Sequence, residues 1–129
     1  MDENAIGTIV VDAALGLHRT LGPGLLESVY EVTLAAELRS RELNVERQVA
    51  VPLVYRGIRF DEGFRVDLLV ASKVIVEIKS VENVNEVHKK QLLTYLRLTD
   101  KRLGYLLNFG HPLMRSGVVR VVNELSEPE

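Results

Sequence analysis

The stretch that decides the fold is Val66-Asp67-Leu68-Leu69-Val70-Ala71-Ser72-Lys73-Val74-Ile75-Val76-Glu77-Ile78-Lys79. Two runs rich in valine, leucine and isoleucine flank the short segment Ala71-Ser72-Lys73, which is the pattern of two β-strands joined by a tight turn. A three-residue loop of this kind would pair Val70 with Val74. The stretch therefore predicts a β-hairpin over residues 64–79.

Charged residues occupy matching positions on the two strands of this hairpin. Counting outward from its first pair puts Asp67 across from Glu77, and facing residues of an antiparallel pair project to the same side, with Cβ atoms about 5 Å apart. Lys79 follows Glu77 on the same face because side chains alternate along a strand. By the same alternation, the opposite face of the first strand should carry Val66, Leu68 and Val70.

Two facing carboxylates in such an apolar setting would cost several kcal/mol unless a cation compensated for their charge. Hard oxygen ligands suit Mg²⁺ or Mn²⁺, which accept one or two carboxylates, keep several waters and take a phosphate oxygen as a further ligand. Lys79 would then orient or deprotonate an attacking water, or neutralise charge on the phosphate. The residues alone also allow a plainer interpretation, in which Glu77 and Lys79 form an ordinary ion pair and Asp67 is exposed near the turn.

Helical periodicity precedes the hairpin. Apolar residues from Ile6 to Leu21 have amphipathic spacing, and the helix that they predict ends at Gly22-Pro23-Gly24. A second helix should begin directly after this joint and run out near Leu43-Asn44. Because the joint is short, the two helices should form a tight corner or hairpin.

The rest of the chain predicts short strands and one more helix. A first β-rich run covers 45–55, with Pro52 indicating an edge or an irregularity, and a short piece surrounds Ile58 and Phe60. Asn83 or Asn85 can cap a helix over 86–99. Strands are expected at 103–109 and 118–122, before a polar, frayed tail over 124–129. The order is ααββββαββ, an α/β fold whose last strands are expected to complete the sheet through a helical crossover.

Composition restricts the kind of protein. The chain has 129 residues, 47% of them hydrophobic, which suits one domain over 1–129. It contains no cysteine, so disulfides and thiolate sites are excluded and a reducing cytoplasm is the expected compartment. No secretory leader and no membrane-spanning run is expected. The net charge of −2 argues against nucleic-acid binding over a broad basic surface, and we expect only local basic contributions, most of them solvated surface charge. The candidates for such contributions are Arg39, Arg41, Arg56, Arg59, Lys89 and Lys90.

Several motifs of the sequence resemble those of a known group of proteins. Asp67, nine intervening residues and Glu77-Ile78-Lys79 resemble the PD-(D/E)XK nuclease signature, although Val66 stands where the signature has proline. The stretches Gly24-Leu25-Leu26-Glu27-Ser28-Val29-Tyr30, Gln91-Leu92-Leu93-Thr94-Tyr95-Leu96 and Leu107-Asn108-Phe109-Gly110 are similar to the GxxExxY protein family, which is placed within that superfamily. The resemblance runs from about Ile6 to Val122 and implies a PD-(D/E)XK restriction-endonuclease-like core, with a mixed central sheet flanked by helices.

The resemblance also implies roles for particular residues. Asp67 and Glu77 would be metal ligands, the Ile78 carbonyl a further ligand, and Lys79 the catalytic lysine. Glu27 matches an acidic residue that many members carry on the first core helix, where it would be both a catalytic residue and a ligand. From the residues alone, Glu27 can instead simply interact with the helix dipole in the first turn.

Gln91 is the last candidate for the site. It lies one turn before Tyr95, with His88 on the same helix side, so all three could face the hairpin, and Gln91 would hold a water or a phosphate. For His88 and Tyr95, exposed helix polarity and core packing are the simpler interpretations. His18 can complement a helix C-terminus, and turn chemistry accounts for Asn108 and His111.

Two functions remain from the sequence. The first is a Mg²⁺- or Mn²⁺-dependent nuclease acting on DNA, with RNA as the alternative substrate. The second is a nuclease fold that serves as a self-assembling or partner-binding scaffold with little or no cleavage. A homo-oligomer is expected under both, because one small domain presents one site.

Overall fold

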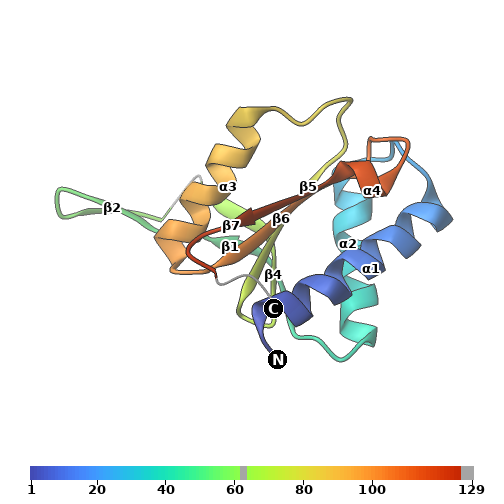
Figure 1. Ribbon diagram of the computed structural model, residues 1–129. Coiled ribbons are helices and arrows are strands. Elements are labelled where there is room, and N and C mark those ends of the chain that lie inside the picture. Colours follow the sequence, from blue (N-terminus) through green and yellow to red (C-terminus); the bar gives the residue numbers. More distant parts are fainter. Residues whose placement is uncertain (62–63, 126–129) are drawn as a thin grey trace.

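The structure, a computed structural model, describes residues 1–61 and 64–125 (Figure 1). Its helices are α1 (Glu3–Leu21), α2 (Glu27–Ser40), α3 (Glu86–Thr99) and the short α4 (Met114–Gly117). Its strands are β1 (Val45–Ala50), β2 (Leu53–Tyr55), β3 (Ile58–Phe60), β4 (Arg65–Val70), β5 (Val74–Lys79), β6 (Leu103–Asn108) and β7 (Val118–Val122).

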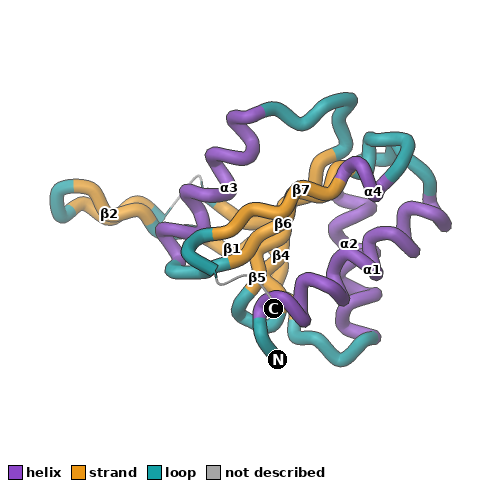
Figure 2. Tube along the Cα trace, viewed as in Figure 1, coloured by secondary structure: helices purple, strands orange, loops and turns teal. Residues whose placement is uncertain are grey.

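Five strands form a mixed central sheet in the order β1-β4-β5-β6-β7. The β5–β6 pair is parallel, because α3 carries the chain back across the sheet, and the other pairs are antiparallel. Helices cover both faces, with α1 and α2 on one side and α3 on the other (Figures 1 and 2). The mixed sheet flanked by helices confirms the predicted fold class.

Apolar residues of β4 and β5 feed two separate cores. The core beneath α1 and α2 includes Leu68, Val70, Val74, Val76 and Ile78. The core beneath α3 includes Val66, Ile75, Leu92, Leu96 and Leu106. The central strand β5 is therefore buried on both faces, as its nearly continuous apolar sequence requires.

The predicted order ααββββαββ needs two corrections. The run 45–55 is two strands, because Pro52 interrupts it: after Ala50 the chain leaves the sheet, and the buried Val51 donates its N–H to Phe64 O at 2.8 Å. Proline has no N–H with which to extend the ladder. β2 then pairs only with β3, and this hairpin projects from the body of the molecule (Figure 1). The second correction is the short helix α4 before β7, which the predicted order lacks.

The other predicted elements lie close to their expected bounds. α1 ends at Leu21, just before the Gly22-Pro23-Gly24 joint, and α3 has the expected bounds with Asn85 as its N-cap. α2 ends at Ser40, a few residues earlier than expected. Of the predicted frayed tail, residues 126–129 lie outside the described part of the chain. No described helix is both long and apolar enough to cross a bilayer.

A tyrosine fixes the joint between α1 and α2. The Tyr30 hydroxyl donates to Gly22 O at 2.6 Å and accepts from Leu25 N at 3.0 Å, while its ring stacks on Phe109 with centroids 4.2 Å apart. Gly22 and Gly24 have φ values of 75° and 87°, which glycine adopts without a Cβ clash. The joint therefore sets where α2 begins, and with it the place of Glu27.

Candidate metal and catalytic site

The candidate site lies where β4 and β5 separate. The expected Val70–Val74 pair is present, but paired residues end at Leu68–Val76, although β4 reaches back to Arg65 and β5 continues to Lys79. Asp67 and Glu77 are therefore not a registered cross-strand pair, which corrects the prediction. Instead, the Asp67 carboxylate fills the opening, and its Oδ2 accepts a hydrogen bond from Ile78 N at 2.7 Å.

The strand β4 rotates at Asp67. Leu68 belongs to the core beneath α1 and α2, whereas Val66 belongs to the core beneath α3, so these residues do not share a face as alternation predicts. The adjacent strand β1 is irregular opposite Asp67. Gln48 has a φ of 54° and has no partner in the β1–β4 register, whereas the residues on either side of it are paired. At this rotation the Asp67 carboxylate contacts the Gln48 side chain of β1 and the Ile78 N–H of β5.

Glu77 is a buried carboxyl with an unsatisfied oxygen. Its residue is 7% exposed, and within the described part of the chain its Oε1 has no hydrogen-bond partner. Burial raises the pKa of Glu77 to about 9, the nearby Asp67 carboxylate adds to the rise, and the charge of Lys79 opposes it. The side chain is therefore protonated at neutral pH in the metal-free protein.

Glu27, the first residue of α2, contacts the chain just after the end of β5. Its Oε1 accepts a hydrogen bond from Ser80 N at 3.2 Å, and the Ser80 hydroxyl donates to Leu25 O at 2.6 Å. The start of α2 is thus tied to the residue that follows Lys79. A small cavity of about 360 Å³ lies beside it and is lined by Glu27, Ser28, Glu31, Gln48, Asp67 and Ile78.

These groups match part of what a divalent cation needs. Within the described residues, no three or more His, Cys, Asp or Glu side chains form a ready-made cation site. Glu77 Oε1 nevertheless has no hydrogen-bond partner among the described residues, and Asp67 lies close enough to raise the pKa of Glu77. Two carboxylates suit Mg²⁺ or Mn²⁺, which retain several waters of their own. The donors therefore fit such an ion in type.

The three candidates on α3 differ in burial and in contacts. Tyr95 is buried in the core beneath α3, and burial, followed by the charges of Glu77 and Asp67, raises its pKa, so its hydroxyl lies within their electrostatic reach. Gln91 is exposed one turn earlier. His88 completes the α3 capping box with Asn85, which accounts for its position.

Residues near the ends of α1 and β6 have structural contacts. His18 is buried, with its Nε2 3.0 Å from His111 O. Asn108 Oδ1 accepts from Val81 N and Gly110 N, and His111 Nδ1 accepts from Leu113 N. The bonds of Asn108 to Gly110 and of His111 to Leu113 are the turn chemistry expected from the sequence, whereas those of Asn108 to Val81 and of His18 to His111 join distant segments of the chain.

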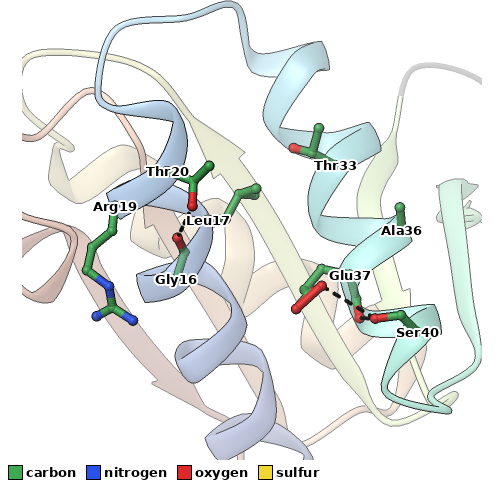
Figure 3. Close-up of a pocket in the computed structure, with 8 residues that line it drawn as sticks. All are labelled: Gly16, Leu17, Arg19, Thr20, Thr33, Ala36, Glu37 and Ser40. Carbon is green, nitrogen blue, oxygen red and sulfur yellow. Dashed lines mark hydrogen bonds between the residues drawn. The ribbon is translucent and has the colours of Figure 1, made fainter.

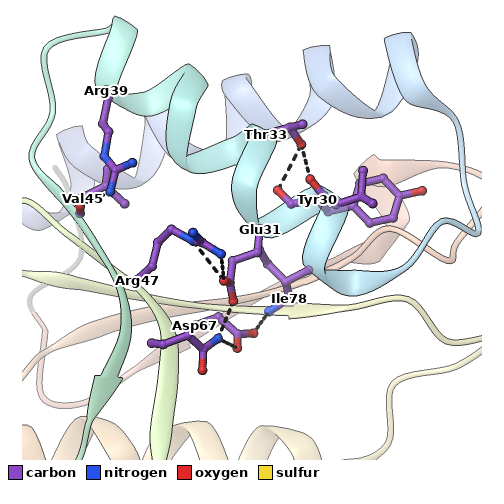
Figure 4. Close-up of polar contacts among 10 residues, drawn as sticks. Tyr30, Glu31, Thr33, Arg39, Val45, Arg47, Asp67 and Ile78 are labelled. Atoms are coloured by element: carbon purple, nitrogen blue, oxygen red, sulfur yellow. Dashed lines mark hydrogen bonds and ion pairs between the residues drawn. The ribbon is translucent and has the colours of Figure 1, made fainter.

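Sequence reasoning missed Glu31, a buried acid beside the site (Figure 4). It lies four residues after Glu27 and therefore on the same side of α2. Its carboxylate accepts hydrogen bonds from Arg47 and Gln48, two neighbouring residues of β1. The sequence signal for Glu31 was its i, i+4 spacing from Glu27 on a helix whose following turns carry buried apolar residues.

A larger hollow of about 700 Å³ lies between α1 and α2, away from these carboxylates (Figure 3). Its hydroxyls already have local acceptors: Thr20 donates to Gly16 O and Ser40 to Glu37 O. The Glu37 carboxylate pairs with Arg41. This hollow therefore offers no cluster of free charged groups for catalysis.

Most of the expected basic residues have acidic or main-chain partners. Arg41 pairs with Asp12 and Glu37, Arg59 with Asp61, and Lys89 with Glu86. Arg39 donates to Val45 O. Arg56 lies over the ring of Tyr55, with its guanidinium carbon 5.5 Å from the centroid. Most of the candidates are also exposed, which agrees with the expectation that they are mainly solvated surface charge.

Comparison with known proteins adds one finding. A family model described as the PD-(D/E)XK nuclease superfamily matches residues 4–121. Neither the curated proteins nor the solved structures gave a match. Nucleases of that superfamily generally use divalent metal ions.

Proposed function

Because the chain belongs to the PD-(D/E)XK nuclease superfamily, we propose that it is a Mg²⁺- or Mn²⁺-dependent nuclease that hydrolyses phosphodiester bonds of DNA, or of RNA as the alternative. The observation that carries the proposal is Glu77 Oε1, a buried carboxyl oxygen for which the described residues supply no partner. An unsatisfied buried polar atom is costly, and a cation-binding role explains why it is kept. The narrower assignment to the GxxExxY family remains a prediction.

The proposed metal ligands are Asp67, Glu77 and the Ile78 carbonyl, with Glu27 as a further carboxylate. A bound divalent ion would polarise the scissile phosphate and lower the pKa of a bound water. Asp67 is suited to this role because Ile78 N–H fixes one of its oxygens. Glu77 must lose its proton to bind an ion, and removing positive charge from Lys79 would make that loss harder.

Lys79 is the proposed catalytic lysine. It is partly buried on β5 and lies on the same face as Glu77, one pleat further along. Its positive charge lowers the pKa of Glu77 against the larger effects of burial and Asp67. From there its ammonium would hold the attacking water or neutralise negative charge on the phosphate. Gln91, exposed on α3, is the proposed polar contact for a water or a phosphate oxygen.

One observation favours the second function, assembly or partner binding. Facing residues of β2 and β3 place Leu53, Tyr55, Ile58 and Phe60 on one side of the projecting hairpin. Tyr55 is 59% exposed, Ile58 58% and Phe60 45%. An isolated two-stranded hairpin is marginally stable, so covering this face would stabilise it. Self-assembly through the hairpin is compatible with nuclease activity.

The experiment that tests the nuclease is cleavage of supercoiled plasmid, single-stranded DNA and RNA by the purified protein. Each substrate is incubated with Mg²⁺, Mn²⁺ or EDTA, and Glu77→Ala and Lys79→Ala are assayed beside the unmodified protein. Arg41→Met is the matched control, because Arg41 pairs only with surface carboxylates on α1 and α2 in the contacts described above.

The proposal predicts metal-dependent cleavage that Glu77→Ala and Lys79→Ala reduce at least about 100-fold and that Arg41→Met leaves unchanged. The substrate that is cut would identify the nucleic acid. Cleavage that persists in EDTA, or in folded Glu77→Ala protein, would contradict the proposed site. If the three substrates are not cut and Mn²⁺ does not bind, the scaffold function is favoured.

A further inference from the structure

Glu31 is a buried carboxylate with both oxygens already occupied. It is 6% exposed, and Arg47 donates through Nε and Nη2 to its Oε2 at 3.1 and 2.8 Å. Gln48 Nε2 donates to its Oε1 at 2.5 Å. The guanidinium supplies the charge that a buried carboxylate requires. Glu31 is therefore held by the protein itself and does not need an added ion.

Gln48 connects this acid to the candidate site. Its Nε2 also donates to Asp67 Oδ1 at 3.2 Å, so one amide group bridges the Glu31 and Asp67 carboxylates. A side-chain amide has two N–H donors, and these two contacts use both. Glu31 therefore fixes the amide, and the amide in turn contacts Asp67.

The bridge coincides with an unusual backbone conformation. Gln48 has a left-handed φ of 54°, which non-glycine residues rarely adopt, and its position is skipped in the β1–β4 register. Arg65 Nη1 donates to Gln48 O at 3.2 Å and holds the main chain from β4. This conformation places consecutive side chains, Arg47 and Gln48, on the same carboxylate instead of on opposite faces of the strand.

We infer that Glu31 and Gln48 are positioning residues that orient Asp67 before any ion binds, and that Glu31 is not itself a metal ligand. The inference rests on the proposed function for its consequence, but its geometry is independent of that function. Gln48 holds Oδ1 and Ile78 N holds Oδ2, so Asp67 is restrained at both oxygens. Each carboxylate oxygen has about two lone-pair sites, so one on each oxygen is left for a cation.

The alternative is that Glu31 binds the ion directly, because it lines the same cavity as Glu27 and Asp67. Against this, a cation on Glu31 would have to displace Arg47 or Gln48 from it. The two roles differ in what Gln48→Met should do. Methionine matches glutamine in length but cannot donate, so it breaks the bridge and leaves the Glu31–Arg47 pair in place.

The test measures two properties of the folded protein. The first is hydrogen exchange of the Ile78 amide in EDTA, which reports whether Asp67 still accepts from it, with the Val76 amide as internal reference. The second is the Kd for Mn²⁺ alone by calorimetry. The proteins are the unmodified chain, Gln48→Met, Glu31→Gln and the control Arg41→Met.

We expect Gln48→Met and Glu31→Gln each to weaken Mn²⁺ binding by about 10- to 100-fold, the usual effect of losing a partner that orients a ligand, without changing the number of ions bound. Exchange at Ile78 should be faster by about 10-fold in both, because its acceptor is freed, with Val76 unchanged. Arg41→Met should change neither property. A merely structural role for the bridge would lower thermal stability but leave the Kd and the Ile78 exchange as they are.

Two outcomes would overturn the inference. One is Gln48→Met protein with unchanged exchange at Ile78. The other is Glu31→Gln protein that loses an ion while Gln48→Met does not, which would make Glu31 a ligand. If the unmodified chain binds no Mn²⁺, the proposed function fails, and the Ile78 exchange still decides whether the bridge orients Asp67.

Discussion

At the residue scale, the proposed site centres on Glu77, a buried carboxyl group whose pKa is raised to about 9. Glu77 is buried on a central strand, with Asp67 beside it, and the positive charge of Lys79 lowers its pKa. A pKa of about 9 means that Glu77, when no metal ion is bound, avoids a buried negative charge next to the partly buried Asp67 carboxylate by retaining a proton. The proton thus occupies the role that we assign to a metal ion.

This arrangement predicts a pH dependence of stability. The pKa of Glu77 is raised from 4.5 to about 9 on folding, so the folded chain binds a proton that the unfolded chain has lost at intermediate pH. The stabilising contribution is fully present below pH 4.5 and is lost as the pH rises towards 9. Glu77→Gln cannot titrate and should remove this dependence, which amounts to at most about 1.4 kcal/mol per pH unit.

Urea unfolding in EDTA at several pH values between the two pKa values measures the difference. The stability of Glu77→Gln relative to the unmodified protein should increase with pH. Parallel pH profiles for the two proteins would show that Glu77 is not protonated in the fold.

The residues of the site were only partly predictable. Asp67 and Glu77 stand out because carboxylates are costly in apolar strands. Their relative geometry was wrong, because the prediction assumed a regular ladder and the chain rotates at Asp67. Glu31 was missed because its burial depends on Arg47, which lies on a different element and is invisible to local periodicity.

At the element scale, the sequence predicts helices and core strands well, because a buried stripe has the period of its element. The bounds of α3, β5 and β7 agree with the expectation. The separation of β2 from β1 was not predicted. Pro52 indicates an irregularity in the run 45–55, but it does not determine which strand the following residues pair with. In the structure Val51 still donates to Phe64 O just beyond the β1–β4 pairing, and the strand after Pro52 pairs only with β3.

The loop after β5 gives a test of element packing. A Cβ on Gly110 would lie 2.6 Å from Val81 N and 2.9 Å from Ser80 C, so Gly110→Ala should displace the loop that holds Ser80. We expect a loss of about 1–3 kcal/mol in the free energy of unfolding.

Gly16→Ala is the matched control on α1. The nearest atom to its added Cβ is Arg19 Nη2 at 3.9 Å, so this change should stabilise the helix by about 0.5–1 kcal/mol. Thermal or urea unfolding of the two variants measures both effects. Equal stability of Gly110→Ala and Gly16→Ala would contradict the described packing of this loop.

At the scale of the whole molecule, the chain places its candidate site between two helix layers and sends a hairpin away from them (Figure 1). The superfamily match over residues 4–121 confirms the predicted superfamily, since the resemblance was read from motifs spread along the same part of the chain. The sequence of one chain does not define the number of copies in an oligomer, because that number depends on contacts between chains.

The hairpin makes that expectation testable. If its exposed face joins two copies, light scattering after size exclusion should give a mass above 14.5 kDa per particle, and Ile58→Glu should shift it towards the single chain. Val87→Glu is the control, because Val87 is 69% exposed on α3, away from the hairpin strands. A single-chain mass for the unmodified protein at micromolar concentration would argue against self-assembly.

The most direct test of the central claim is calorimetric titration of the metal-free protein with Mn²⁺ at neutral pH, repeated in buffers with different heats of ionisation. The account predicts saturable binding that Asp67→Asn and Glu77→Gln abolish, with release of about one proton as Glu77 becomes a ligand. Absence of binding, or binding that both variants retain, would contradict a metal site at Asp67 and Glu77.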